Sequence, residues 1–575
     1  MTSRFKILLP LLQLFMLVGI LVIFTRHVFY FDFVCDDAFI SFRYAENLAR
    51  HGELAFNLGQ RIEGYSNFLW TLMLAAGAGL GADTVWLSKI LGWVFGALGI
   101  ALVWRVGQGR TSDGTRGADP DAPPGRVSLA VIFETQTAIL LTATLVFMGS
   151  LILAMASSYA CWSSGGLETQ AFTLLVTAAI FRFLIEEREE DAGEEPRRWS
   201  GLVFALATMT RPEGAAYFLM AAAWRAGKVL LRTRRGELSA SESAASLRRD
   251  LEGLGLFFAP VAAWLLWRVY YYGDILPNTY YIKSGGRDMI LRGAWDLGIY
   301  LSMTKLYILL PPMALGWLSG LKYFRERWGE PRSGLSMNFL LLVVAATIFY
   351  YIWIGGDFME LARFLVPALP LAALVSQEGI FLLYNIAGAG QGRASAYSLV
   401  LKWVFFFTVI TFFAFYSQTQ IAASAYAMTD HSRGGTDSIG YLKKAANQWK
   451  IVGLWLKNDA EKRGRTKASL ATSAAGAIPY YTGMTTLDLL GLNDPVIPRM
   501  NLKIGNRPGH TRGADWSYIM LWDVDYFVGH PEIEPKPKNL SAFDLGYMKA
   551  LGYERRVATP AGLDPPYFQF WFRTD

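Results

Sequence analysis

The chain carries little charge for its 575 residues. Only 18% of its residues are Asp, Glu, Lys or Arg, against about 25% in ordinary soluble domains. By contrast, 53% are hydrophobic, and the mean hydropathy is +0.27. A soluble core cannot hide so large an apolar fraction, so a soluble globular protein is excluded. Long apolar runs recur to about residue 420, which predicts a polytopic membrane protein.

Cysteine and histidine are also scarce. The two cysteines, Cys35 and Cys161, are too few for a disulfide scaffold or a cysteine-rich metal site. Both fall on the predicted outer side, so a bridge between them is one interpretation; we favour the other, two buried free thiols. The five histidines show no metal-ligand spacing such as HExxH, and the chain has no P-loop and no GxSxG motif. The chemistries that those motifs carry therefore lack support.

The apolar runs predict eleven membrane spans, at residues 7–29, 84–105, 128–152, 167–186, 199–210, 213–231, 253–272, 297–321, 336–354, 364–386 and 398–419. The apolar stretch 66–82 would make twelve. With eleven spans the basic loops 105–126, 225–249 and 322–332 all face the cytoplasm, as the positive-inside rule requires, whereas twelve would put them outside. We therefore predict that residues 66–82 do not cross, and that the N-terminus is cytoplasmic.

The composition changes after residue 420. Residues 1–420 hold the apolar runs and a first external loop at 30–83, whereas in 421–575 charges, prolines and short alternating stretches replace those runs. The pattern predicts an amphipathic helix at 447–464 and strands at 467–476, 485–492, 524–531 and 567–575. The fold class is therefore a polytopic α-helical membrane protein with a C-terminal soluble α/β domain on its outer side.

Two adjacent carboxylates, Asp36 and Asp37, follow the first span in the stretch FVCDDAFISFRYAENLARHG. Desolvating an ionised carboxylate is costly, so acids at this depth indicate a function. The alternative is that they cap a helix, because Asp is a favoured N-cap residue and an amphipathic pattern follows. The pair alone leaves both interpretations open.

Further acids and arginines gather at the predicted outer ends of spans, a shared level that would let them line one cavity. They lie in DDAFISFRYAEN with LAFNLGQRIEGYSNFLW, in WSSGGLETQ, in TRPEG, in GDILPNTYYIK and in GGDFMELARFLVPALP. The planar fork of Arg suits phosphate oxygens, and a carboxylate near a hydroxyl suits general-base catalysis. Each single residue is more simply half of an ion pair, but together the segments predict transfer of a group from a phosphate to an alcohol.

At these positions the sequence resembles the GT-C superfamily of polyprenyl-phosphate-sugar glycosyltransferases. Asp36-Asp37, Arg43-Tyr44 and the string NLGQRIEGY at 57–65 carry the likeness, followed in order by WSSGGLET, TRPEG, PNTYYIK, GGDFME and AAGAIPYYTGMTTLDLLGLND. The group it resembles most is that of the mycobacterial terminal arabinofuranosyltransferases. The first loop departs from that group in one place: LAFNLGQRIEGYSN has Leu after the first Asn, where the group has Pro. This difference weakens the assignment to any one sugar substrate.

The resemblance implies a GT-C membrane domain over 1–420, with membrane-parallel helices in the 30–83 loop, and an extracytoplasmic domain over 421–575. It also implies an inverting displacement in which an acid of the Asp36-Asp37 pair is the general base. We expect Asp36 to be the base and Asp37 to orient it or the acceptor; in the alternative, Asp37 is the base and Asp36 caps the helix. The candidates for binding the donor phosphate are Arg211, Lys283 and Arg363, with Arg43 and Arg61 behind them. The candidates for binding sugar or acceptor are Glu168, Asp357, Glu63, Asn278 and Tyr280.

The partners expected from the resemblance are a polyprenyl-phosphate-linked sugar, which could be arabinofuranose, and a hydroxyl of a cell-envelope glycan. The place would be a bacterial cytoplasmic (inner) membrane, with the active site on the periplasmic side. A protein acceptor is one alternative. A transporter or flippase of lipid-linked glycans is another, although the internal repeats that favour it are not seen. A nucleic-acid partner is disfavoured because apolar segments separate the basic clusters. The use of a divalent cation stays open, since no oxygen-rich ligand string decides it.

Overall fold

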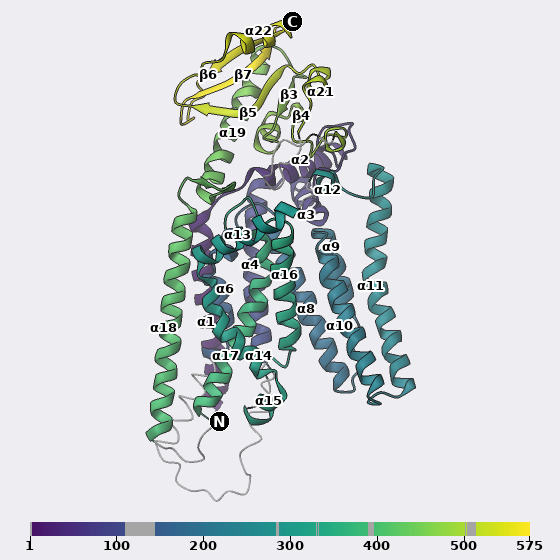
Figure 1. Ribbon diagram of the computed structural model, residues 1–575, viewed down its shortest axis with the longest axis vertical. Coiled ribbons are helices and arrows are strands. Elements are labelled where there is room, and N and C mark those ends of the chain that lie inside the picture. The colour runs from purple at the N-terminus through teal and green to yellow at the C-terminus, as the bar shows by residue number, and fades with distance from the viewer. Residues whose placement is uncertain are drawn as a thin grey trace, which may run out of the picture.

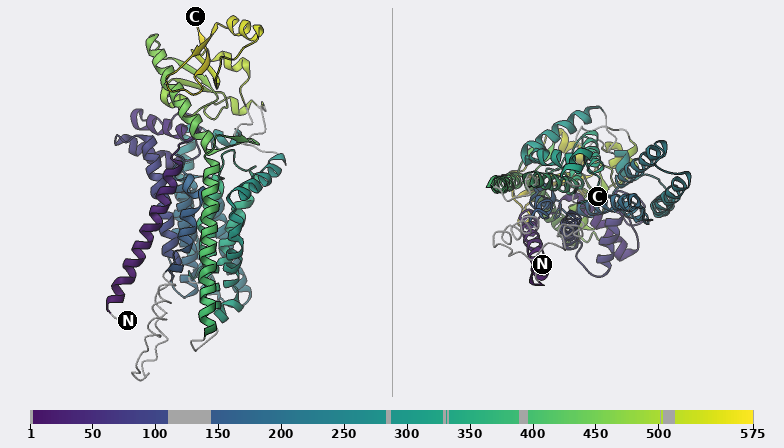
Figure 2. Two further views of the ribbon diagram at one scale, coloured as in Figure 1. Left: turned by 90° about the vertical axis from the view of Figure 1, so that its left-hand side faces the viewer. Right: turned by 90° about the horizontal axis from the view of Figure 1, so that it is seen from below.

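The computed structural model describes residues 3–109, 144–282, 287–328, 331, 333–388, 396–500, 502 and 513–574. Long helices run side by side and form a body, and a sheet-containing domain stands on one end of it (Figure 1). The C-terminus lies in this outer domain, whereas the N-terminus lies at the opposite end of the body (Figure 2).

The body contains most of the helices. They are α1 (Ser3–Phe31), α2 (Asp36–His51), α3 (Phe68–Gly79), α4 (Thr84–Gly107), α6 (Met148–Met155), α7 (Ser157–Cys161), α8 (Thr169–Asp191), α9 (Trp199–Thr210), α10 (Gly214–Arg234), α11 (Ala240–Tyr272), α12 (Asn278–Ile282), α13 (Arg287–Thr304), α14 (Leu310–Ser319), α15 (Lys322–Trp328), α16 (Met337–Trp353), α17 (Leu369–Gly388) and α18 (Ala396–Ala427). Two 3-10 helices, η1 (Leu306–Leu309) and η2 (Arg363–Ala368), precede α14 and α17.

Within the described ranges, six helices are long and apolar enough to cross a membrane, or seven if one bent pair counts as a span. In that pair, α13 and the segment of η1 and α14 meet at 79°. Where we predict a single span over 297–321, the chain therefore bends. The cause is Lys305, whose left-handed φ of 55° ends α13. The predicted span at 128–152 lies largely outside the described residues, and the total of eleven spans stays a prediction.

Helices α2 and α3 lie at the outer end of the body, next to the outer domain (Figure 1). The 12 residues of α3 measure about 18 Å, well short of the roughly 30 Å of a bilayer core. Helix α2 starts at Asp36, directly after α1, and ends at Gly52, whose φ of 72° allows its N–H to bond back to Leu48 O. Its central residues, from Ala38 to Ala45, are buried.

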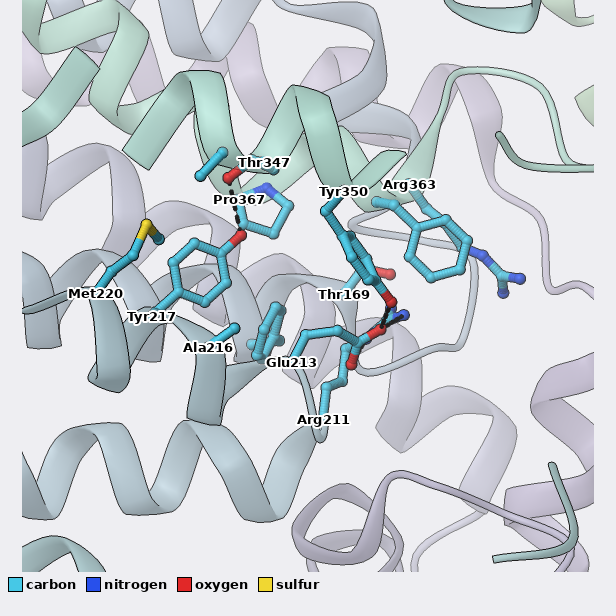
Figure 3. A pocket seen from close by; sticks show the side chains of 13 residues that line it. Thr169, Arg211, Glu213, Ala216, Tyr217, Met220, Thr347, Tyr350, Arg363 and Pro367 are labelled. Carbon is cyan, nitrogen blue, oxygen red and sulfur yellow. Dashed lines mark hydrogen bonds and ion pairs between the residues drawn. The ribbon is translucent and has the colours of Figure 1, made fainter. Parts of the chain in front are cut away.

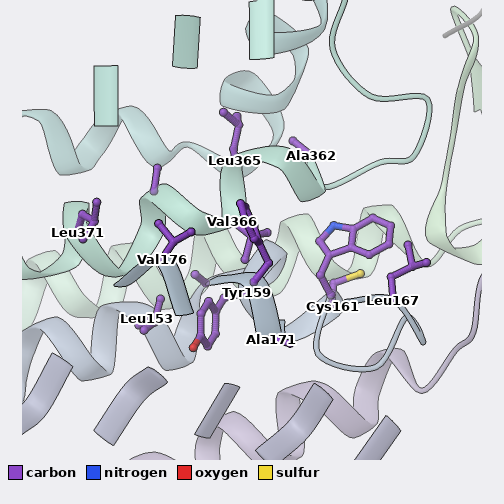
Figure 4. Close-up of a cluster of buried hydrophobic side chains, with 14 of the residues drawn as sticks. Leu153, Tyr159, Cys161, Leu167, Ala171, Val176, Ala362, Leu365, Val366 and Leu371 are labelled. Atoms are coloured by element: carbon purple, nitrogen blue, oxygen red, sulfur yellow. The ribbon is translucent and has the colours of Figure 1, made fainter. Parts of the chain in front are cut away.

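A continuous apolar core joins the helices of the body. Tyr159 and Cys161 of α7 pack with Leu365 and Val366 of η2 in its middle (Figure 4). Both Cys35 and Cys161 are buried free thiols, which confirms the interpretation that we favour from the sequence. The thiol of Cys35 donates a hydrogen bond to Gly165 O at 3.4 Å, so it helps to fasten the start of α2 to the loop before α8.

The outer domain is a five-stranded sheet with helices. Its strands are β3 (Ser469–Thr472), β4 (Thr485–Asp488), β5 (Tyr526–Glu534), β6 (Tyr553–Ala558) and β7 (Tyr567–Arg573), in the order β4-β3-β5-β7-β6. Strand β3 is parallel to β4 and β5, and β7 is antiparallel to β5 and β6. Its helices are α19 (Ile439–Lys462), α20 (Ala477–Thr482), η3 (Ile497–Arg499), α21 (Trp516–Leu521) and α22 (Ala542–Ala550). A small hairpin precedes them, formed by β1 (Ser432–Arg433) and β2 (Thr436–Asp437).

This confirms the predicted long helix and the four predicted strands of the outer domain. The fifth strand, β6, has the sequence YERRVA, whose charged centre lacks the apolar alternation that indicates a strand. It pairs with β7 along its whole length, so tertiary pairing rather than local pattern makes it a strand.

Candidate active site

Two hollows adjoin at the outer end of the body. We call the first the apolar groove; it lies between α8, α10, α16 and η2, and its apolar lining includes Phe172, Ala216, Tyr217, Met220, Ala346 and Pro367. We call the second the polar cavity; its lining includes Asp37, Ser41, Tyr65, Asn67, Glu168 and Thr279. Arg211, Arg363 and Phe364 line both. The outer domain adds Leu492 to the wall of the polar cavity.

Arg211 stands where the TRPEG segment breaks the chain between α9 and α10. Its Nη2 lies 3.1 Å from Glu213 Oε1, and its Nη1 lies 3.3 Å from Glu168 Oε1. Tyr350 of α16 donates a hydrogen bond to Glu213 Oε1 at 2.8 Å. Figure 3 shows Arg211, Glu213 and Tyr350 pointing toward one another at one end of the groove, with Tyr217 bonded to Thr347 farther along it. The guanidinium is thus held at the mouth of an apolar space.

Arg363 opens η2 after the GGDFMELAR turn. Two residues in the left-handed conformation, Leu361 with φ of 64° and Ala362 with φ of 42°, precede it. Its Nε donates to Asp357 Oδ2 at 3.0 Å, and its Nη1 lies 3.9 Å from Asp37 Oδ2. Burial raises the pKa of Asp357, and the neighbouring Arg363 opposes that rise. Asp357 therefore lies behind the arginine and steadies it.

The two acids of the Asp36-Asp37 pair point to different partners. Asp36 accepts hydrogen bonds from the backbone N–H of Ala477, at 2.7 Å, and of Gly476, at 3.1 Å. Burial raises the pKa of Asp36 to about 7. The side chain of Asp37 is 39% exposed and lines the polar cavity. Only Asp37 of the pair thus faces both the cavity and Arg363.

A network of polar groups continues the wall of the cavity. Asn67 donates to Glu168 Oε2 at 2.7 Å, and Ser41 donates to Asn67 Oδ1 at 3.1 Å. Sequence reasoning did not single out Asn67, although a polar residue directly before the apolar run of α3 was a usable signal. Tyr350 had no such signal, because it lies within the apolar sequence of α16.

Other predicted site residues lie outside the two hollows. Arg43 donates to three backbone carbonyls, those of Phe56, Pro479 and Met484, at 2.6 to 2.7 Å. Glu63 forms a buried ion pair with Arg268 of α11 at 2.5 Å. These two residues hold segments of the chain together and are not brought to the arginines of the cavity.

The remaining candidates also stand apart. The side-chain amide of Asn278 donates to Asp494 O at 2.8 Å. Tyr280 is 61% exposed, and the guanidinium of Arg61 lies 4.8 Å from the ring centre of Tyr271. Lys283 lies outside the described residues. Among the residues that are described, no group of three or more His, Cys, Asp and Glu side chains is placed to hold a metal ion.

Comparison with solved structures identifies the class of fold. The chain is similar to ArnT from Cupriavidus metallidurans bound to undecaprenyl phosphate, with a TM-score of 0.50 and 11% identity over 99% of this chain and 98% of that one. The apo state of the same protein gives a TM-score of 0.50 and 11% identity over 97% of each chain. The chain therefore has an ArnT-like GT-C fold, which confirms the predicted fold class.

Comparisons of the sequence are less informative. A family model described as a domain of unknown function (DUF8728) matches residues 439–566, which is most of the outer domain. No curated protein matches the chain.

Proposed function

We propose that the chain is a membrane glycosyltransferase that moves a sugar from a polyprenyl-phosphate donor to a hydroxyl of a cell-envelope glycan. The observation that carries this proposal is the meeting of the apolar groove and the polar cavity at Arg211 and Arg363. A lipid-linked sugar is divided in the same way, because its isoprenoid tail is apolar, its sugar is polar and its phosphate lies between them. The likeness of the fold to ArnT bound to undecaprenyl phosphate is in keeping with this donor.

The phosphate would lie between the two arginines. Each guanidinium presents several N–H donors in a plane, which suits phosphate oxygens. Arg211 is held by Glu168 and Glu213, and Arg363 by Asp357, so both forks are oriented before the donor binds. Such fixed charges stabilise the negative charge that develops on a leaving phosphate.

Asp37 would act as the general base. The acceptor oxygen attacks the anomeric carbon while Asp37 takes the proton of the attacking hydroxyl. The bond between the anomeric carbon and the phosphate oxygen breaks, and its electron pair stays with the polyprenyl phosphate. One displacement inverts the configuration at that carbon. This assignment departs from the expectation that Asp36 is the base, because the outer domain occupies both oxygens of Asp36.

The wall of the polar cavity would bind the hydroxyls of the sugar. Glu168, Asn67 and Ser41 form one connected set of donors and acceptors there. Asp357 contributes by holding Arg363. Arabinofuranose as the sugar and a glycan as the acceptor rest on the sequence resemblance. A bacterial inner membrane rests on the same resemblance, and the placement of the cavity and the outer domain on its periplasmic side rests on the distribution of basic loops.

The test is a transfer assay on the purified chain in lipid nanodiscs. Synthetic polyprenyl-phosphoryl arabinofuranose and a short arabinan serve as donor and acceptor, beside a panel of lipid-linked hexoses. We expect transfer from one donor, its loss in Asp37→Asn with donor binding retained, and its persistence in Asp32→Asn. Asp32 is a matched control, since it is an acid of the same external segment paired with Lys89 on the surface.

Two outcomes would contradict the proposal. Full transfer by Asp37→Asn would remove Asp37 as the base. Transfer from none of the donors, together with movement of intact lipid-linked sugar across a vesicle membrane, would favour a flippase instead.

A further inference from the structure

The outer domain contacts α2 at Asp36, the residue before Asp37. Both carboxylate oxygens of Asp36 accept backbone N–H groups at the start of α20. The two segments touch here so closely that a Cβ on Gly476 would lie 2.0 Å from Asp36 O and 2.5 Å from Asp36 Cγ. Only glycine permits this approach, so the contact depends on the residue type on both sides.

A second contact between the outer domain and α2 lies two turns farther along the helix, at Arg43. Arg43 donates to Pro479 O and Met484 O, both at 2.7 Å, and these two carbonyls lie within and just after α20. The guanidinium is buried, and its hydrogen-bond partners among the described residues are backbone carbonyls and neutral side chains. Its donors therefore join α2 both to the outer domain, at Pro479 and Met484, and to Phe56 and Asn57 of the first external loop.

Aromatic side chains pack between the contacts at Asp36 and Arg43. The ring of Phe39 lies 5.4 Å from that of Tyr480 and 5.6 Å from that of Tyr481. The hydroxyl of Tyr480 bonds to Glu46 and, at 2.9 Å, to Thr84 Oγ1. Residues 36, 39, 43 and 46 form one stripe on a helix of 3.6 residues per turn, so the whole of α20 lies along a single face of α2.

This stripe determines where Asp37 points. Successive residues of a helix are turned by about 100° around its axis, so Asp37 projects to one side of the face of α2 that contacts α20. That side is the polar cavity, where its carboxylate meets Arg363. A rotation of α2 about its axis would carry Asp37 away from the cavity, and it would break the contacts with α20 together with the bond from Ser41 to Asn67.

We propose that the outer domain positions the general base, because α20 docks on the stripe of Asp36, Phe39, Arg43 and Glu46 and sets the rotation of α2. The inference rests on the proposed function, since it concerns the same carboxylate. Asp36 and Gly476 are positioning residues that act through Asp37. The segment matched as a domain of unknown function contains α20 and would have this docking as its role.

The experiment uses the full chain in nanodiscs and the variants Asp36→Asn and Gly476→Ala. The matched control is Gly546→Ala, a helical glycine of the same domain whose added Cβ would meet no atom within 4 Å. Hydrogen–deuterium exchange of peptides from α2 is measured first, because it requires no substrate. We expect roughly tenfold faster exchange in both positioning variants and wild-type exchange in the control.

Transfer kinetics then test the link to catalysis. We expect kcat to fall roughly 10- to 100-fold, the size of effect that a misplaced catalytic group produces, with the KM for the donor unchanged. The double variant Asp36→Asn with Gly476→Ala should lose no more than the worse single variant, because both act through one contact.

Unchanged exchange of α2 in Asp36→Asn would overturn the docking role, whether or not the chain transfers a sugar. Faster exchange with an unchanged kcat would overturn the positioning of Asp37. If no donor is used at all, the exchange data still decide the docking, so failure of the proposed function and failure of this inference are told apart.

Discussion

The two ends of the helix body both gather arginines among acids, and the apolar groove and the polar cavity lie around those of the outer end. At the outer end, Arg211 and Arg363 line the groove and the cavity. At the opposite end, where α8 and α10 finish and α11 begins, Arg225 contacts Glu187, Glu190 and Asp250. No residue of this inner-end cluster lines either hollow.

Arg363 and Arg225 differ in how completely their guanidinium groups are paired with acids. Arg225 reaches carboxylates of α8 and α11 from α10, so every arm of its guanidinium is engaged by an acid. Nη1 of Arg363 comes no nearer than 3.9 Å to Asp37, which is longer than a hydrogen bond. Arg211 is also paired with acids through Nε, Nη1 and Nη2, yet it lines both hollows. An arginine beside acids is therefore a candidate site residue where it lines a cavity, whether or not its pairing is complete.

The largest effect should follow from Arg363→Ala. Loss of one preorganised charge at a developing anion costs on the order of 100- to 1,000-fold in rate, and this change also leaves Asp357 buried without its partner. We expect kcat/KM to fall by that amount and donor affinity to fall with it. Steady-state kinetics and binding of the lipid-linked donor measure both. An unchanged donor affinity would place the phosphate elsewhere.

At the inner end, Arg225→Ala should act on stability and not on chemistry. Removing one partner of a buried charge cluster costs about 3–5 kcal/mol, so we expect a lower unfolding temperature in detergent. The protein that remains folded should keep the kcat of the wild type. A loss of kcat in Arg225→Ala without a loss of stability would contradict the purely structural role predicted for the inner end.

The groove can be tested by filling it. Ala216 of α10 lines the apolar groove, so Ala216→Trp should exclude part of the isoprenoid. We expect the donor KM to rise several-fold for long-chain donors and to change little for a donor with a short prenyl chain. Ala226→Trp, on the same helix but outside the groove, is the control. Equal losses for long and short chains would argue against the groove as the lipid site.

The last prediction concerns the dependence of stability on pH. Burial raises the pKa of Asp36 from its ordinary 3.8 to about 7, so the folded protein binds this proton more tightly than the unfolded chain. The contribution of Asp36 to stability is therefore greatest below about pH 4, declines as the pH rises to about 7 and is constant above that. Unfolding of the wild type and of Asp36→Asn between pH 4 and pH 8 should show this difference in slope. Parallel curves would contradict it.

Much of the architecture follows from the sequence because it depends on local patterns. Apolar runs predict the body helices, and alternation predicts four strands of the outer domain. The motifs DDAFISF, TRPEG and GGDFMELAR also pointed to Asp37, Arg211 and Arg363, because a charge at the end of an apolar helix is conspicuous. The bend at Lys305 was missed, since a left-handed residue within an apolar run leaves no compositional trace.

Within the polar segments, the sequence alone could not separate residues of the candidate site from residues that hold segments of the chain together. Arg43 and Arg363 look alike in the sequence, as arginines amid aromatic residues. One donates to the carbonyls of a domain that begins hundreds of residues later, and the other faces a cavity. The long-range contact decides the role, and no local pattern contains it.

The sequence by itself predicted the fold class of this protein and the level of the candidate site, because hydropathy and charge act residue by residue against a bilayer. The tertiary structure alone decided which acid of the Asp36-Asp37 pair faces the cavity. The two side chains project from α2 in directions about 100° apart, and the oxygens of Asp36 are bonded to the backbone at Gly476, 440 residues farther along the chain, and at Ala477.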